Sequence, residues 1–503
     1  MEVSILSAIS LLFSLTGGQE LKFVPAVARN LKVFTDPRSG GSPTNPGIEV
    51  QLTAKGLDYI NKVSGQILNE EIRNARIPDV SQSFRRGSVS AKSIRIISFG
   101  APRYYYRLIG AKKLSWSLDR GSIAVKGNWN GKYKKLITIR GSGSFTAGAS
   151  NVAVSVSAVP RKDADGRPRM DQVRCSCSLS LSLRVKGGIV GWIVNILRRK
   201  IADRLRPVLQ DAVCKMAVKF VSSDMNKKLA SLKTTIPLRR AFTADYRLIK
   251  DPIVGRNDVI TWHKGEVRHV GPGIATPFYP HPLKSSSDCS KMLFLRASDY
   301  VLNSLMHHAH RTNATQFVVN GKTLPDAASY LSLDCSFDNI CLGTLFPDIP
   351  ERFRHGKGEV KLKTLTYPVV VFQRGFASIN LTGTVEIHVR LQNDQFQLLN
   401  ATVLTAVEFV PRVDGAEGKG TPKISGTARI RQLKATNVVA EHLDEAFLQL
   451  FLDFARPIIE KQANKILAKG LPLVLSKGAI VKNFKVQLLE RTLEFGADLA
   501  YYR

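Results

Sequence analysis

The chain of 503 residues lacks the short motifs that carry several kinds of catalysis. It contains no GxSxG nucleophile motif, no HExxH zinc motif and no phosphate-binding P-loop. Its six cysteines form no CxxC pair, so the sequence does not predict a cysteine-bound zinc ion. The segment His307-His-Ala-His310 has no accompanying Cys or carboxylate motif, and a turn of this kind more often faces solvent than binds a metal. We therefore predict no enzyme, no metal site and no cofactor.

The chain also lacks a later apolar run long enough to cross a bilayer as a helix, which takes about 20 residues. Residues 4–15 form an uncharged apolar run of 12 residues, and Thr16-Gly-Gly18 follows it. Such a run before small residues is typical of a secretory signal peptide, so we predict a signal at residues 1–18. The mature protein is expected to be extracellular, or to be stored in granules before release.

Three Asn-X-Thr sequons agree with export, and they predict glycosylation at Asn313, Asn380 and Asn400. Asn380 is the best placed of the three. Ile379 and Leu381 flank it in an alternating pattern, which puts Asn380 on the solvent face of a strand.

Carboxylates are scarce in the first half of the chain. Residues 19–250 contain 43 Lys and Arg against 15 Asp and Glu, a net charge of +28. Residues 251–503 contain 30 against 24, a net charge of +6. This asymmetry predicts an anionic partner for the first half. Export and the lack of a recognisable nucleic-acid-binding module argue against nucleic acid as that partner.

Two similar stretches, residues 45–60 and 291–303, lie about half a chain apart. In each, a short apolar strand leads into a helix that opens on an Asp-Tyr pair, first at Asp58 and again at Asp299. Their separation of 241 residues is too long for a solenoid repeat and indicates a duplicated domain.

Both halves then follow one plan. Strands of period 2 fill residues 84–185 and 314–440, and long amphipathic helices follow at 191–232 and 443–468. A twisted antiparallel sheet wrapped around the helices would bury their apolar stripes. We therefore predict an α+β protein of two barrel-like halves.

The Pro-rich segment 251–288 is the natural linker between these halves. It separates an N-terminal cationic domain, residues 19–250, from a C-terminal domain, residues 289–503.

The cysteines of an exported chain are expected to pair in part. Cys177 lies on the Leu-bearing face of its strand, and Cys214 lies on the helix that must cover that face. A bridge between them would join helix to sheet, although Cys175 shares the same face and is the rival partner. Cys335 and Cys341 are close enough to bridge across a turn, and the sequence leaves that pairing open.

Several segments, taken together and in order, resemble the family of bactericidal/permeability-increasing protein, lipopolysaccharide-binding protein and the plasma lipid transfer proteins. They are Asn45-Pro-Gly-Ile48, Lys55-Gly-Leu-Asp-Tyr59, residues 76–84, Val190-Gly-Trp192, the Cys177 and Cys214 pair, and Phe495-Gly-Ala-Asp498. The resemblance implies an elongated, boomerang-like monomer of two pseudo-symmetric barrels, each a twisted antiparallel sheet with two helices, joined by a central antiparallel sheet. It also implies the Cys177–Cys214 disulfide.

The resemblance further implies an apolar phospholipid pocket in each half and a lipopolysaccharide site in the tip loops of the first barrel. The pocket would draw on helix stripes, with candidates Leu57, Ile60, Val63, Ile67, Ile193 and Leu197. The tip loops would include Arg85, Arg86, Lys126, Trp129, Lys132, Lys134, Lys135, Arg161, Lys162, Arg167 and Arg169. The sequence departs from the family's tryptophan hairpin because Asn128 and Asn130, not cations, flank Trp129.

Two functions are compatible with these features. The first is a secreted innate-immune protein that binds lipid A and anionic bacterial outer membranes, with antibacterial or endotoxin-neutralising activity. The second is a carrier that moves phospholipid between membranes or lipoproteins. The charge asymmetry favours the first, because a transfer protein needs no strongly cationic half.

Overall fold

The computed structural model describes residues 40–501, with the exception of residues 74–78, 86, 111, 135–137, 188–205, 208, 239–241, 272–274, 326–327, 336–340, 392–393, 415–422, 441–442, 444, 470 and 473–478. The chain divides into two compact units. The N-terminal unit comprises Gln51–Leu232 and Lys250–Thr261, and the C-terminal unit comprises Met1–Val50, Lys233–Ile249 and Trp262–Arg503. The domain boundaries inferred from the sequence, at 250 and 289, remain predictions.

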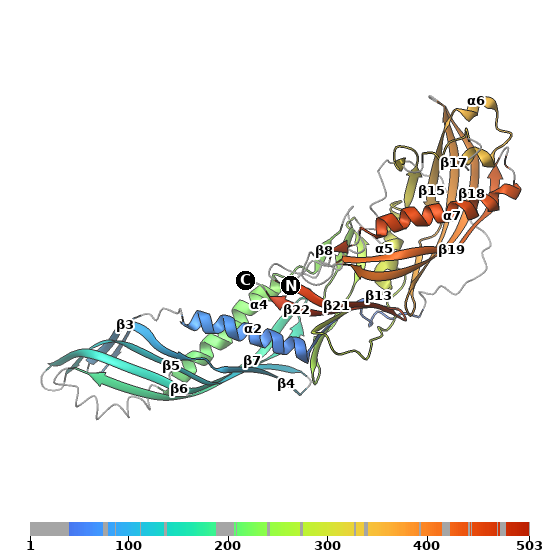
Figure 1. Cartoon of the computed structure of the whole chain (residues 1–503). Coiled ribbons are helices and arrows are strands. Elements are labelled where there is room, and N and C mark those ends of the chain that lie inside the picture. Colours follow the sequence, from blue (N-terminus) through green and yellow to red (C-terminus); the bar gives the residue numbers. More distant parts are fainter. Residues whose placement is uncertain are drawn as a thin grey trace. The chain divides into compact units, whose positions relative to one another are not determined.

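The N-terminal unit is built on an antiparallel sheet with the strand order β2-β3-β5-β6-β7, and β4 pairs with β5. β5 and β6 have 22 and 25 residues, and β-bulges interrupt their pairing near Gly121. Bulges bend a strand and increase its twist, so the long strands curve in Figure 1. The strands are β2 (Val80–Phe84), β3 (Gly87–Gly100), β4 (Arg103–Ile109), β5 (Lys113–Lys134), β6 (Thr138–Lys162) and β7 (Pro168–Lys186).

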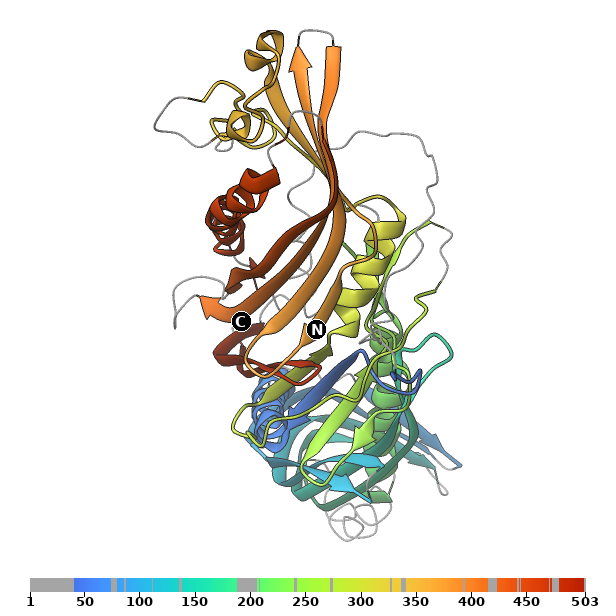
Figure 2. The same cartoon turned by 90° about the vertical axis from the view of Figure 1, so that its right-hand side faces the viewer.

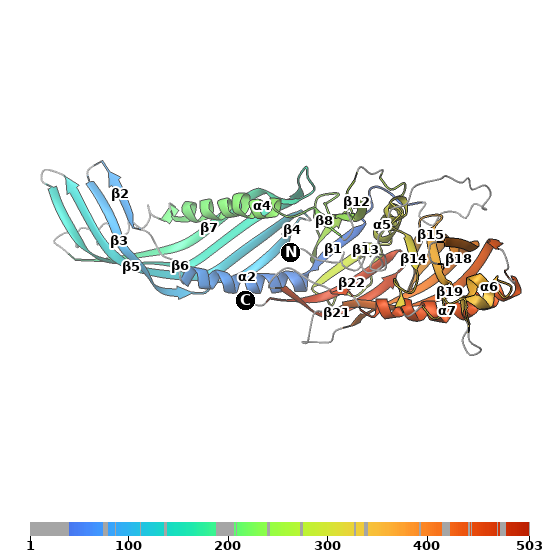
Figure 3. The same ribbon diagram turned by 90° about the horizontal axis from the view of Figure 1, so that it is seen from above.

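Helix α2 (Ala54–Arg73) packs against β4 on one face of this sheet (Figure 3). Tyr104 makes the contact: its hydroxyl donates to Asn69 Oδ1 at 2.8 Å, and its carbonyl accepts from Asn61 Nδ2 at 2.8 Å. Gly65 faces the Tyr104 ring so closely that a Cβ there would come within 2.5 Å of Cδ2. The glycine therefore lets the helix lie directly on the tyrosine.

A second helix follows β7 on the same face of the sheet. Helical residues 209–219 continue into η2 (Phe220–Met225), a stretch of π-helix, and α4 (Asn226–Ala230). The side chain of Asn226 accepts from Met170 N and donates to Met170 O, at 2.7 and 2.9 Å. This pair of hydrogen bonds fixes the end of the helix to the edge of β7.

The predicted Cys177–Cys214 disulfide is wrong, because the bridge joins Cys175 to Cys214 with a Cα–Cα distance of 5.4 Å. Cys177 has a free thiol, and burial raises its pKa. Both cysteines of β7 point toward the helix, as expected for residues two apart on a strand. The position of Cys214 along the helix then selects Cys175, and this position depends on tertiary packing.

The C-terminal unit contains three sets of hydrogen-bonded strands. β1 (Ile48–Thr53), β13 (Leu293–Ser298), β22 (Thr492–Tyr501) and β21 (Ala479–Leu489) pair in that order. β12 (Glu266–His269), β9 (Phe242–Asp245) and β8 (Thr235–Pro237) form a small sheet. The large sheet has the order β14 (Gln316–Val319), β15 (Lys357–Thr364), β17 (Ala377–Leu391), β18 (Asp394–Asp414), β19 (Lys423–Ala440) and β20 (Leu471–Pro472), with β16 (Val369–Phe372) on β17. β10 (Ile253–Val254), which belongs to the N-terminal unit, pairs with β11 (Asp258–His263).

Two principal helices accompany these strands in the C-terminal unit. α5 (Tyr300–Arg311) packs on β12 and β13, and α7 (Glu445–Leu467) packs on β19. Figure 2 shows the long strands of the large sheet in orange and α7 beside them in red. The described residues of the unit also form two short helices, η4 (Leu342–Leu345) and α6 (Glu351–Arg354). The helices and antiparallel sheets of the two units confirm the predicted α+β class.

Among the described residues, no helix is both long and apolar enough to cross a membrane.

The histidine segment at the end of α5 differs from its prediction as a surface turn. His307 and His308 are buried, and His307 lies edge-on to Phe278 and Tyr367. His310 is half-buried, and its Nδ1 lies 2.7 Å from Thr364 Oγ1. The segment therefore forms part of the packing between α5 and its neighbours.

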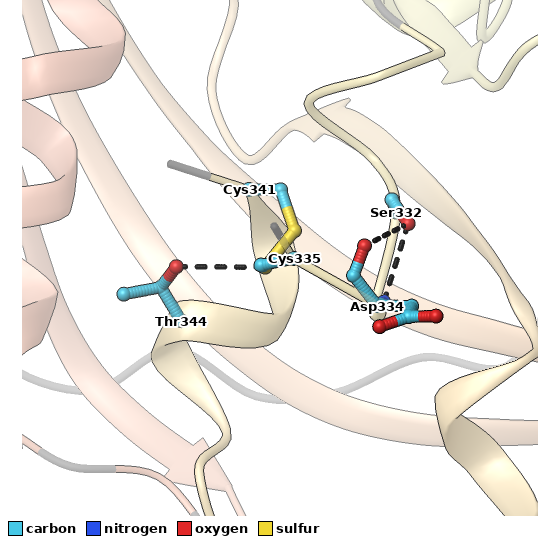
Figure 4. Close-up of a disulfide and its surroundings, with 5 residues drawn as sticks. All are labelled: Ser332, Asp334, Cys335, Cys341 and Thr344. Atoms are coloured by element: carbon cyan, nitrogen blue, oxygen red, sulfur yellow. Dashed lines mark hydrogen bonds between the residues drawn. A yellow bond between two sulfur atoms is a disulfide. The ribbon is translucent and has the colours of Figure 1, made fainter. Parts of the chain in front are cut away.

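A disulfide joins Cys335 to Cys341, with a Cα–Cα distance of 5.6 Å (Figure 4). Thr344 lies beside it, with Oγ1 3.5 Å from Cys335 Sγ. The bridge precedes η4, whose Leu342 and Leu345 are buried in the core of the C-terminal unit.

The unfolding free energy of the C-terminal unit is expected to fall as the pH drops from about 6.5 to about 4. Burial lowers the pKa of His263 to about 4, while its hydrogen bond to the Tyr246 carbonyl opposes the shift. Between these pH values the unfolded chain binds a proton that the folded chain does not. The full loss is up to about 3 kcal/mol, and it should be smaller in His263→Gln. Urea unfolding at several pH values measures it, and equal pH slopes in both proteins would contradict the assignment.

Candidate cationic site

One face of the last third of β5 is cationic. From Lys126 to Lys134, the even-numbered residues are exposed and the odd-numbered residues that the structure describes are buried or half-buried. Lys126, Lys132 and Lys134 therefore project from the same face. This face is directed away from the helices, because the Cys175–Cys214 bridge shows that α4 and its preceding helix cover the opposite one. We call it the outer face.

Cross-strand pairing extends these lysines into rows. Arg95, Lys126, Thr146 and Arg184 lie side by side on β3, β5, β6 and β7. Lys92, Asn128, Ser144 and Lys186 form the neighbouring row. Nearer the end of the sheet, Lys132 lies between Ser88 and Arg140. Directly paired residues point to the same side of a sheet, so all the cations of these rows share the outer face.

The rows contain like charges in direct opposition. Arg95 is opposite Lys126, and Lys132 is opposite Arg140. Such pairs destabilise a sheet unless an anion lies between them. The strand segments 80–100, 121–150 and 173–187 contain no Asp or Glu. Asp79 directly precedes β2, and its Oδ1 accepts from Ser93 N at 2.9 Å beside Lys92, so it is the carboxylate next to the Lys92 row. The outer face is thus a strongly cationic surface with strands about 4.8 Å apart.

Sequence reasoning found part of this surface. It identified Lys126, Lys132 and Lys134, but as residues of a loop. Arg85 lies exposed in the turn between β2 and β3, at the same end of the sheet. The predicted residues Arg86 and Lys135 are outside the described part of the chain. Five row members were missed, and all are exposed: Lys92, Arg95, Arg140, Arg184 and Lys186.

The second predicted basic cluster lies at the other end of the sheet. Arg161 and Lys162 end β6, and β6 begins beside the turn that follows Lys134. Roughly 70 Å of strand separates Arg140 from Arg161. The three arginines of this cluster pair with carboxylates: Arg161 with Asp251 at 3.2 Å, Arg167 with Asp165 at 2.5 Å and Arg169 with Asp171 at 2.7 Å. The structure therefore does not bring all the predicted cations into one tip.

Trp129 lies on the inner face, opposite the cations of β5. Its side chain is only 9% exposed, and its Nε1 donates to the carbonyl of Lys186 at 3.3 Å. Gly143 makes room for the indole, since a Cβ there would lie 3.0 Å from Nε1 and 2.0 Å from the Lys186 oxygen. Trp129 therefore joins β5 to β7 and is not part of a loop.

The inner face and α2 carry apolar side chains that are incompletely buried. Val125, Phe145, Leu183 and Val185 are half-buried, as are the predicted pocket residues Leu57, Val63 and Ile67. Ile60 is 36% exposed, and the predicted Ile193 and Leu197 lie outside the described residues. By contrast, the four clusters of buried apolar residues found in the described chain all belong to the C-terminal unit. The apolar side chains inside the N-terminal unit thus keep part of their surface exposed.

Models of a known protein family match both halves of the chain. Residues 56–226 match the model of the LBP / BPI / CETP family, N-terminal domain, and residues 238–501 match the C-terminal domain of the same family. The chain belongs to this family. The resemblance seen in the sequence is thereby confirmed.

Individual relatives are distant but extend over most of the chain. A bactericidal permeability-increasing protein of Sebastes schlegelii is 24% identical, covering 91% of this chain and 96% of that protein. A human lipopolysaccharide-binding protein is also 24% identical, covering 97% and 100%. A mouse phospholipid transfer protein is 20% identical over 69% of each chain.

The crystal structure of a lipopolysaccharide binding protein matches with a TM-score of 0.55 at 23% identity, covering 91% of this chain and all of that one. This match supports the fold.

Proposed function

We propose that this family member binds lipopolysaccharide through the cationic rows of the N-terminal unit. The proposal rests on the charge of the outer face. Lys126, Lys132 and Arg140 lie there, and the residues paired with them on the adjacent strands include no carboxylate. Phosphate groups bind Lys and Arg through charge-assisted hydrogen bonds, and each cation near an anionic surface contributes on the order of 1 kcal/mol. Several relatives are named lipopolysaccharide-binding proteins, which supports the same ligand.

The lipid part of the ligand would use the inner face. Acyl chains gain about 0.8 kcal/mol for each buried CH₂ group. The half-buried stripe of α2 and the facing residues Phe145 and Leu183 offer apolar area that the protein itself leaves partly uncovered. Bound phospholipid is accordingly expected in purified protein, and mass spectrometry of the extracted lipid would detect it.

The same inner face supports a second function, the transfer of phospholipid between membranes or lipoproteins. A phospholipid transfer protein is among the relatives, but it covers less of the chain than the lipopolysaccharide-binding proteins do. Acyl-chain transfer needs only the inner face, whereas the outer-face rows favour a phosphorylated, membrane-borne ligand. We therefore place lipopolysaccharide first.

We propose further that the protein is secreted as a monomer, is not an enzyme, and acts in antibacterial defence or endotoxin neutralisation. Asn313 and Asn380 are exposed and Asn400 is half-buried, so the first two are the better glycosylation candidates. Peptide mapping of protein from a secreting eukaryotic host would show signal cleavage and site use.

The triple variant Lys126→Gln, Lys132→Gln, Lys134→Gln is expected to bind lipopolysaccharide about a hundredfold more weakly, since each lysine contributes on the order of 1 kcal/mol. The wild-type affinity should also fall as salt rises, more steeply than that of the variant. Fluorescence titration with labelled lipopolysaccharide measures both.

The matched variant Arg161→Gln, Arg167→Gln, Arg169→Gln removes the same charge from the other end of the sheet, where carboxylates already pair with the arginines. It should bind nearly as the wild type does. Equal losses in the two variants would show that net charge, and not the outer face, determines binding.

A further inference from the structure

The second helix of the N-terminal unit carries large apolar side chains on its solvent side. Met216 is 65% exposed, Phe220 is 54% exposed and Leu209 is 39% exposed. At about 3.6 residues per turn, these three residues fall on one narrow stripe. Cys214, which bridges to β7, lies on the opposite side of the helix. The exposure is therefore a consequence of how the helix is attached, and we call these three residues the helix stripe.

The helix stripe is held on a rigid support. The disulfide fixes the helix at Cys214, and the Asn226 amide pairs with Met170 of β7. Val221, on the side of the sheet, is buried. The helix therefore cannot turn its stripe inward without breaking these contacts. Figure 3 shows the helix in green along the sheet.

Basic residues border the stripe. Lys215 and Lys219 lie on one flank and are exposed, and Lys227 and Lys228 follow in α4. Residues 209–230 contain two carboxylates, and one of them, Asp211, pairs with Lys215 at 2.7 Å. Apolar residues between lysines are the pattern of a helix that lies in the interface of an anionic bilayer.

We propose that the helix stripe docks the protein on the surface of a phospholipid bilayer that contains anionic lipid. A bilayer interface accepts a single apolar stripe inserted to the depth of the headgroups, about 5–10 Å. A stable protein interface takes about 20–30 residues from each partner. Three side chains on one helix suffice for the first and fall well short of the second. This contact is separate from the outer-face rows, which lie on the other side of the sheet.

The test uses sedimentation with vesicles of phosphatidylcholine and a minority of phosphatidylglycerol, without lipopolysaccharide. The variant Met216→Gln, Phe220→Gln should bind these vesicles about tenfold more weakly, because it loses two apolar side chains from the interface. The matched control is Val318→Gln, Val439→Gln, which changes two exposed apolar residues of the C-terminal unit and should bind as the wild type does. Unchanged binding of the stripe variant would overturn the proposal.

A second measurement places the helix directly. The Phe220→Trp variant adds a tryptophan to those of the wild type. The emission of this added tryptophan should shift to the blue when the protein binds these vesicles, and brominated lipid should quench it. No shift, or no quenching, would contradict docking by the stripe. If instead the wild type self-associates without lipid and the stripe variant is monomeric, the stripe is a contact between copies and the proposal fails.

The two proposed surfaces can fail separately. The stripe variant should keep its affinity for lipopolysaccharide, and the Lys126, Lys132 and Lys134 triple variant should keep its vesicle-dependent blue shift when it also carries Phe220→Trp. If the triple variant loses both lipopolysaccharide binding and vesicle binding while the stripe variant keeps both, the outer face binds the vesicles. That result would overturn docking by the stripe.

Discussion

Replacing Arg296 with Met is expected to lower the free energy of unfolding of the C-terminal unit by about 3–5 kcal/mol. Arg296 lies on β13 and is only 4% exposed. Its Nη1 contacts Glu49 Oε1 at 2.6 Å, and its Nε contacts Glu494 Oε2 at 2.7 Å. Met fills a similar volume but leaves two carboxylates without their shared cation in a poorly solvated site.

The pH dependence of the variant provides a further check. Burial alone would raise the pKa of Glu494, but hydrogen bonds from Ser286, Arg296 and Gln487 hold it below its usual value. Without Arg296 this carboxyl should bind a proton more readily. The deficit of the variant should therefore be largest near neutral pH and smaller under acidic conditions. Urea unfolding at two pH values measures this difference.

A surface ion pair in the same unit provides the comparison. Arg412 contacts Asp414 at 3.3 Å, and the two side chains are 57% and 42% exposed. Exposed pairs contribute about 0–1 kcal/mol, so Arg412→Met should change stability little. Equal effects of the two substitutions would show that burial of the Arg296 triad is not what makes it important.

Much of the fold could be predicted because the spacing at which apolar residues recur along the chain indicates the secondary structure directly. The alternation of Leu179, Leu181 and Leu183 with serine predicts a strand, and the structure has strand β7 at this place. The repeated Asp-Tyr pair predicts the two helices that follow β1 and β13. These are local properties of the chain, and the structure retains them.

The cationic rows could not be assembled from the sequence because register is not local. Lys92 and Arg95 are three residues apart, so simple alternation puts them on opposite faces of β3. A β-bulge between them shifts the register by one residue, and both then pair with exposed residues of β5, Asn128 and Lys126. Neither the bulge nor the partner strand is visible in the residues of β3 alone.

The same limit explains the two clusters of predicted tip cations. Lys134 and Arg161 both lie at ends of long strands, and sequence pattern does not say which ends meet. The structure shows that β6 runs between them along its full length. Composition identified the basic half correctly. Only the order and length of the strands show that its charge divides between an end with few carboxylates and an end where arginines form ion pairs.

Replacing Cys175 with Ser is expected to destabilise the N-terminal unit by about 4 kcal/mol, whereas Cys177→Ser should change stability little. The Cys175–Cys214 bridge spans a sequence separation of 39, and chain entropy assigns about 4 kcal/mol to closing a loop of that size. Cys177 is half-buried with a free thiol, so serine there loses no cross-link. Denaturant unfolding of the two variants measures the difference, and non-reducing peptide mapping identifies the bridge.

The two substitutions together decide between the pairing found and the one predicted from the sequence. Cys175 and Cys177 share the inner face of β7, about 7 Å apart along the strand. In Cys175→Ser the Cys177 thiol is therefore the nearest substitute for Cys214, but reaching it requires the helix to move along β7 and to strain the Asn226 contact with Met170. Peptide mapping of Cys175→Ser would reveal such a substitute bridge, and its stability should stay below that of the wild type. A larger loss in Cys177→Ser than in Cys175→Ser would restore the original prediction.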